Sequence, residues 1–222
     1  GSGRMLVSRL GFSDMSESQK TLAGATLGLG LLSLGGMLLG ALGLYKPWAA
    51  SALLAALWLA GFSELKPALE SLAPDQSLLR ERPLAAAAIA LPLLAALWMC
   101  LVPPHQYDSL VYHLKLPQEY LRVGRLHAPG GLVYSHFPQN GEMLFTLSLL
   151  LGSDVLAQMF VWLSTALTVG WLLTFGRRLT VAAPWAAVLV ATHSAVLVRS
   201  STTYVEPLVM LWTTAAILAF EA

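Results

Sequence analysis

The sequence predicts an all-α fold, and within that class a polytopic integral membrane helix bundle of about six transmembrane helices, with an outer loop that carries membrane-surface helices. Hydrophobic residues make up 56% of the 222 residues. Charged residues make up only 11%, whereas soluble proteins carry about 25%. Six apolar stretches come close to the roughly 20 residues that a helix needs to cross a bilayer. A surface with so few charges is suited to lipid rather than to water.

Turn-forming or charged residues separate the six apolar stretches. The first stretch is rich in glycine, which is typical of membrane helices that approach one another closely. Pro47 suits the first turn of the second helix, and two prolines follow the third stretch. The expected spans are residues 22–45, 47–65, 83–102, 155–175, 179–198 and 204–222.

The distribution of Lys and Arg predicts the orientation of the bundle. With a cytoplasmic N-terminus, eight of these residues fall on the inner side and five on the outer side, which is the usual bias of membrane proteins. This topology predicts a bacterial inner (cytoplasmic) membrane location. It divides the chain into a cytoplasmic segment (1–21), three helices (22–102), an outer, periplasmic loop (103–154) and three further helices (155–222).

The outer loop begins with a polar stretch, "PPHQYDSLVYHLKLPQEYLRVGRL", at residues 103–126. Asp108 is placed to cap a short helix over residues 109–115. Pro117 suits the first turn of a second helix, which Gly124 would end. The return stretch is rich in Pro, Gly and Asn and predicts turns. Glu142 and Asp154 flank a short apolar segment that reads as a half-helix dipping into the bundle.

Two carboxylates are the candidate reactive groups. Asp108 lies in the outer loop, and Glu206 lies beside a proline at the mouth of the last span, so the predicted topology places both on the same side of the membrane. Such a pair can serve as a base with a metal ligand or as a base with a positioning group. The alternative readings are structural: a helix cap for Asp108 and a carboxylate favoured by a helix dipole for Glu206.

Three segments together resemble bacterial polytopic glycosyltransferases of the GT-C fold, relatives of the protein O-mannosyltransferases and aminoarabinose transferases. They are "YDSLVYHLKLPQEYLRVGRL", "YSHFPQNGEMLFTLSLLLGSD" and "TTYVEPL". The resemblance implies that Asp108 is the catalytic base, that Glu206 is the second acidic residue, and that a sugar on a polyprenyl phosphate is the donor. The family often carries two adjacent acidic residues at the first position, whereas Asp108 stands between Tyr107 and Ser109. Family members usually have about ten or more spans, so this chain would correspond to the N-terminal part.

The loop offers further candidate ligands. Lys115, Arg122 and Arg125 can bind a lipid phosphate or simply contact headgroups. His113 and His136 are candidates for a divalent metal or for substrate, although the histidine spacing fits no standard zinc pattern. The only cysteine, Cys100, lies in an apolar run and reads as a small core residue.

Two functions of different classes follow from these patterns. The first is a membrane glycosyltransferase that takes a polyprenyl-phosphate sugar. The second is a non-catalytic accessory subunit that packs against other membrane protein subunits, for example in a photosynthetic or respiratory assembly. Gly36 and Gly40 form a G-x-x-x-G pair that favours close helix packing, either within the chain, against its third or sixth span, or with a partner. Membrane lipids are expected partners in both cases, and the net charge of +1 gives no indication of nucleic acid.

Overall fold

The computed structural model describes residues 1–9, 15–71, 80–176 and 182–220, and every regular element in these ranges is helical. The all-α prediction is therefore confirmed for the described residues. Short 3₁₀ or π helices are η1 (Phe62–Glu64), η2 (Ser109–His113) and η3 (Val133–His136). The α-helices are α1 (Ser2–Arg9), α2 (Glu17–Ala41), α3 (Pro47–Ala60), α4 (Leu65–Ser71), α6 (Pro83–Met99), α7 (Lys115–Val123), α8 (Asn140–Leu150), α9 (Asp154–Thr174), α11 (Ala183–Thr192), α12 (Ser194–Ser200) and α13 (Glu206–Phe220).

Each of the six predicted spans contains a helix, but the helices differ in length. Among the described residues, two are long and apolar enough to cross a membrane: α2 with 25 residues and α9 with 21. The bent pair of α3 with η1 and α4, kinked by 59°, would make a third. Helices α6, α11 and α13 are apolar but have only 17, 10 and 15 residues. The structure therefore supports two or three candidate spans rather than six.

The predicted fifth span, residues 179–198, is interrupted. Its first three residues lie outside the described ranges, and its helix stops at His193, whose φ of −67° and ψ of 120° are extended. A new helix, α12, begins at the next residue. A histidine within a span is expected to bond to a neighbouring helix, but His193 is exposed at this break.

Helix α9 forms the centre of the bundle, with α2, α13, α6, α8 and α11 packed around it. Its polar side chains bond to neighbouring helices: Trp171 donates to Thr26 of α2 at 2.9 Å, and Gln158 donates to the backbone of Cys100 at 3.0 Å. Such bonds satisfy polar groups that lipid cannot. Cys100 is fully buried, which confirms that it is a core residue.

The glycine pair of α2 contacts other parts of the same chain. A Cβ atom at Gly36 would lie 3.1 Å from the backbone of Met143 in α8, and one at Gly40 would lie 2.3 Å from the Tyr45 hydroxyl and 2.7 Å from Leu126. The close approach is therefore made to α8 and to two loop residues, and not to the third or sixth predicted span.

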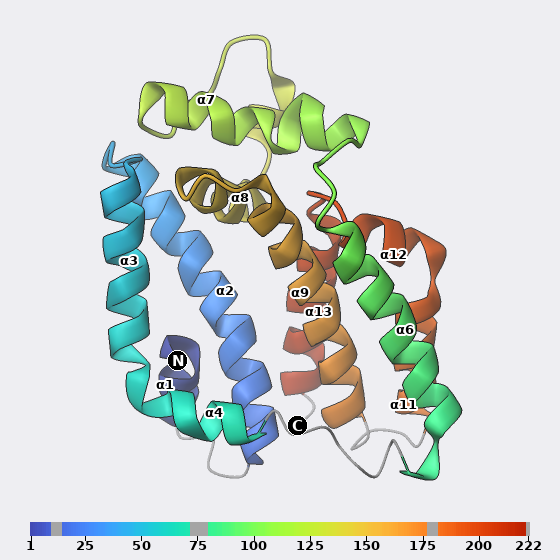
Figure 1. The fold of residues 1–222 in the computed structure, drawn as a ribbon. Helices are drawn as coiled ribbons and strands as arrows, with labels where there is room; N and C mark the ends of the chain where they lie inside the picture. The colour runs from blue at the N-terminus through green and yellow to red at the C-terminus, as the bar shows by residue number, and fades with distance from the viewer. Residues whose placement is uncertain (10–14, 72–79, 177–181, 221–222) are drawn as a thin grey trace.

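Figure 1 shows α7 lying across one end of the bundle, above α8 and nearly at right angles to α2, α3 and α9. The turn after α2 is bonded to this region, since the Leu126 amide donates to Gly40 and the Tyr45 amide donates to Gly124. The loops before α9 and α13 start at the same end (Figure 1). We call this the loop end of the bundle, and the opposite end, which carries α1 and α4, the α1 end.

Candidate functional site

The outer loop forms two short helices close to the predicted positions. Helix η2 is π-helical, with the Leu114 amide donating to the Ser109 carbonyl five residues back at 2.9 Å. Helix α7 ends at Gly124, whose φ of 82° is left-handed and therefore favours glycine. Both helices and their boundary were expected. Asp108 stands at the N-terminal boundary of η2 but makes no side-chain capping bond, so its interpretation as a helix cap is wrong.

A histidine and a glutamate form a buried pair beneath this loop. His113 Nδ1 lies 2.8 Å from Glu142 Oε1, and the two side chains are only 3% and 5% exposed. The other carboxylate oxygen, Glu142 Oε2, is buried and has no partner among the described residues. Glu142 belongs to α8, whose other buried residues are mostly apolar. The pair thus joins the outer loop to the bundle through a polar contact in an apolar setting.

Tyr204 brings Asp108 into the same region. Burial raises the pKa of Tyr204, and the neighbouring Asp108 carboxylate adds to this rise through its negative charge and through a hydrogen bond. The Tyr204 ring also lies 5.6 Å from the His113 ring, centroid to centroid. Asp108 is half-buried. Its carboxylate therefore interacts with a residue 96 positions further along the chain.

Tyr112 is the second tyrosine of the site. Burial raises its pKa to about 12, and the negative charges of Asp108 and Glu206 contribute to the rise. Its ring stacks on Tyr134, with centroids 4.1 Å apart and planes at 11°. Phe137 meets the edge of Tyr134 at 5.7 Å. These aromatic rings form a partly exposed apolar wall beside the carboxylates.

Glu206 pairs with a cation at the rim of the site. Arg199 Nε lies 3.2 Å from Glu206 Oε1, and both side chains are about half exposed. The Arg199 guanidinium also lies 5.8 Å from the centre of the Tyr204 ring. Because Glu206 and Asp108 both act on Tyr112 and Tyr204, the two predicted carboxylates occupy one region. Whether they are catalytic stays a prediction.

The three predicted phosphate-binding cations differ in their surroundings. Lys115 and Arg122 both bind the Glu119 carboxylate, at 3.1 and 2.8 Å. These hydrogen bonds, the one from Arg122 first, lower the pKa of Glu119. Arg125 is exposed and has no ion pair within the described ranges. A phosphate would therefore have to compete with Glu119 for two of the three cations.

The two predicted histidine ligands do not come together. His113 is bound to Glu142, whereas His136 is exposed in η3, next to a cavity of about 350 Å³ lined by residues of the return loop. In the part of the chain that the structure describes, no group of three or more His, Cys, Asp or Glu side chains could hold a metal ion. The residues described here do not fit a metal centre.

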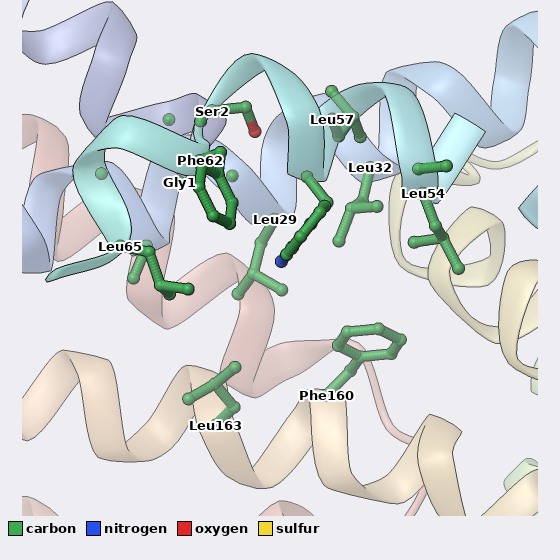
Figure 2. A pocket seen from close by; sticks show the side chains of 17 residues that line it. Gly1, Ser2, Leu29, Leu32, Leu54, Leu57, Phe62, Leu65, Phe160 and Leu163 are labelled. Atoms are coloured by element: carbon green, nitrogen blue, oxygen red, sulfur yellow. The ribbon is translucent and has the colours of Figure 1, made fainter. Parts of the chain in front are cut away.

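A separate apolar cavity of about 610 Å³ lies toward the α1 end. Figure 2 shows Leu29, Leu32 and Leu54 from α2 and α3 facing Phe160 and Leu163 of α9 across it. Its lining is almost wholly apolar and includes none of the candidate site residues. The cavity can hold hydrocarbon but offers no reactive group.

No protein-family model, no curated protein and no solved structure matches this chain. The class that its fold and site define is an all-helical protein with two or three helices that could cross a membrane. At one end of its bundle it carries a cluster of carboxylates, tyrosines and one buried histidine.

Three residues of this cluster were absent from the predicted site. Glu142 was assigned only to the flank of a half-helix, and Tyr204 only to the start of a span. By sequence alone, Tyr112 is typical of the aromatic belt at a membrane surface. The available indication was the isolation of Glu142 in "NGEMLFTLSLLL", because a lone carboxylate in an apolar helix needs a partner.

Proposed function

We propose that the loop end of the bundle binds a sugar linked to a polyprenyl phosphate and transfers it to an acceptor at the outer face of a bacterial inner membrane. The observation that carries the proposal is the convergence of Asp108 and Glu206 on the same two tyrosines, although 98 residues separate them. The membrane setting is supported by the two helices long enough to cross a bilayer and by large apolar side chains on the surface, such as Leu84 (86% exposed) and Trp98 (74%).

In this proposal Asp108 is the general base. It takes the proton from an acceptor hydroxyl or amine while the acceptor atom forms a bond to the anomeric carbon of the sugar. The bond from that carbon to the phosphate oxygen breaks, and its electron pair leaves with the polyprenyl phosphate. A single displacement of this kind inverts the anomeric centre. A positioned base contributes roughly a factor of 10² to 10⁴ to such a reaction.

The other residues have supporting roles in the proposal. Glu206, held by Arg199, orients the acceptor. The wall formed by Tyr112, Tyr134 and Phe137 supplies an apolar face against which a sugar ring can rest. Lys115, Arg122 and Arg125 bind the phosphate through charge-assisted hydrogen bonds, and the first two exchange Glu119 for it.

The broader topology is part of the same proposal. We infer a cytoplasmic N-terminus and six membrane segments, in which α6, α13 and the broken pair of α11 and α12 are shortened segments packed against α9. This arrangement puts the loop end of the bundle on the outer side. It would place the donor lipid beside the site, with its prenyl chain in the bilayer.

The test is replacement of Asp108 by Asn. This change keeps the size of the side chain and removes the base. Membranes containing the protein and a polyprenyl-phosphate sugar should transfer labelled sugar to lipid or protein acceptors, and the Asp108→Asn variant should lose this transfer by about 10² to 10⁴-fold. Ser148→Ala, a change at a buried polar residue of α8 outside the candidate site, is the control and should keep full transfer. Undiminished transfer by Asp108→Asn would remove Asp108 from the mechanism.

A second candidate is the accessory membrane subunit, favoured by the exposed apolar surface of α6, which includes Leu84 and Trp98. The glycine pair of α2 does not add to this candidate because it is used inside the chain. Purification in mild detergent separates the two functions. A stoichiometric membrane protein that stays bound through purification supports the subunit, and an active monodisperse monomer supports the enzyme.

A further inference from the structure

The π-helical turn of η2 changes which residues face Asp108. In an α-helix, residues three and four positions along lie over a given residue, so Tyr112 would lie over Asp108 and His113 would turn away. The bond from the Leu114 amide to the Ser109 carbonyl spans five residues and brings His113 back toward the face of Asp108. Tyr112 and His113 can therefore both approach Tyr204. π-helical turns are rare and are frequent at functional sites.

Stability does not explain the buried pair of His113 and Glu142. Burying ionisable groups costs several kcal/mol each (roughly, after relaxation), and a well-packed apolar pair in their place is often as stable or more stable. The pair is also incomplete, because its second carboxylate oxygen, Glu142 Oε2, is buried with no partner among the described residues. A partly satisfied buried network destabilises a fold relative to an apolar core. The pair is therefore expected to have a role other than stability.

The position of the pair indicates that role. His113 is the last residue of η2, and Glu142 lies in the first turn of α8, a helix packed against α2, α7 and α9. Their 2.8 Å bond ties the end of the π-helical turn to the rigid part of the bundle. The same turn carries Asp108 at its other end. Whatever fixes His113 therefore also fixes the distance between Asp108 and Tyr204.

We propose that His113 and Glu142 are positioning residues, which hold η2 in its π-helical register and so keep the Asp108 carboxylate on Tyr204. This inference rests on the proposed function for its purpose, since Asp108 is the base there. The test of this inference does not depend on the proposed function, because the contact between Asp108 and Tyr204 can be measured without any transfer reaction. Without the pair, the turn relaxes toward an α-helix and Asp108 moves away from Tyr204.

The measured quantity is the pH at which half of the Tyr204 hydroxyl groups are ionised, called here the Tyr204 midpoint. It is monitored by NMR of the full chain with ring-labelled tyrosine, and the Tyr204 signal is assigned by its loss in Tyr204→Phe. The titratable and charged groups around Tyr204 are Asp108, Glu206, Arg199, Tyr112 and His113. Asp108→Asn removes the charge that helps hold the Tyr204 pKa high, so it lowers the midpoint. Glu142→Ala and His113→Ala should lower it as well. Adding Asp108→Asn to either variant should then produce no further shift.

Two further variants keep the test decisive. His113→Asn retains an amide N–H at the position of Nδ1, so it should still bind Glu142 and leave the midpoint close to that of the unmodified chain. If the alanine variants do not fold, the double variant His113→Phe with Glu142→Leu, which replaces the pair by apolar side chains of similar volume, should lower the midpoint in their place. Ser148→Ala, buried in α8 and bonded only to its own helix at Leu144, is the control for buried changes and should shift nothing.

The inference is overturned if Glu142→Ala leaves the Tyr204 midpoint unchanged, or if Asp108→Asn lowers it equally with and without the pair. It is also overturned if His113→Asn lowers the midpoint as far as His113→Ala does. A shift in the Tyr204 midpoint combined with full transfer by Asp108→Asn would instead leave the inference standing and remove the proposed function.

Discussion

The two ends of the bundle both bury charged side chains, but they treat them differently. At the α1 end, Arg4 is 3% exposed and its guanidinium bonds to Glu64, to Thr21 and to both the side chain and the backbone of Glu17. At the loop end, Glu142 keeps one oxygen without a partner in the described chain. A fully satisfied buried network makes a fold rigid, whereas a buried polar atom without a partner is costly. The comparison therefore predicts that the α1 end contributes more to stability than the loop end does.

The largest loss of stability is expected from breaking the complete network. Arg4→Met removes hydrogen bonds from a charged donor to Glu64, Thr21 and Glu17 and should lower the free energy of unfolding by about 1–3 kcal/mol. Thermal unfolding in detergent measures this loss. Lys66→Met is the control, because its 3.9 Å pair with Glu70 is exposed on both sides and surface pairs contribute about 0–1 kcal/mol. Equal losses in both variants would mean that the α1 end is not stabilised by its network.

The second prediction breaks the incomplete network. The double variant His113→Phe with Glu142→Leu replaces the buried pair by apolar side chains of similar volume. The free energy of unfolding should stay unchanged or rise by up to about 1–4 kcal/mol, while the Tyr204 midpoint falls. Chemical denaturation, with the single variant Glu142→Leu for comparison, measures the stability. A clear loss of stability in the double variant would make the loop end structural, like the α1 end.

The third prediction concerns pH. Burial holds the pKa of Tyr112 at about 12, above its ordinary value of 10.0, so the folded state keeps the proton that the unfolded state loses. The stability contributed by Tyr112 is therefore complete below about pH 10 and is lost as the pH rises toward 12. Unfolding midpoints across this window should fall less steeply for Tyr112→Phe. An identical pH dependence in the two proteins would contradict the burial of this hydroxyl.

The smallest effect is expected on the exposed face of α7. Glu119→Gln frees Lys115 and Arg122 from their shared carboxylate and should lower the unfolding temperature only slightly, with the difference disappearing at high salt. If these cations bind lipid phosphate, the same variant should bind more tightly to vesicles that contain a polyprenyl phosphate. Arg125→Gln removes one of the three cations and is the control in the opposite direction. It should bind these vesicles more weakly than the unmodified chain does.

Hydropathy located the six apolar helices but not their lengths. Pro47 begins α3 as predicted, whereas α2 begins at Glu17, after a capping box at Ser16 and five residues before the predicted span. Hydropathy could not show the break at His193, because an extended residue between two apolar helices leaves the average unchanged. The actual length of a span depends on backbone angles that apolar neighbours do not specify.

The candidate site was also predicted only in part. Asp108 and Glu206 were predicted to share a side of the membrane from topology, and they share a region of the structure. The pairs of His113 with Glu142 and of Glu119 with Lys115 were not predicted. The second is an ordinary helical i,i+4 pair that local spacing could have indicated. The first requires the register of a π-helical turn, which depends on tertiary packing and has no sequence pattern.

The order of the site residues along the chain sets a delay during synthesis. Asp108, His113 and Glu142 emerge first, while Tyr204 and Glu206 emerge up to 98 residues later. At the usual rate of about 5–20 residues per second, this gap lasts roughly 5 to 20 s. During that interval η2 can bind Glu142 through His113, but Tyr204, which contacts Asp108, has not yet been synthesised. Nascent chains arrested before residue 204 should therefore leave the Asp108 carboxylate more exposed to water than it is in the full chain, where it is half-buried beside Tyr204.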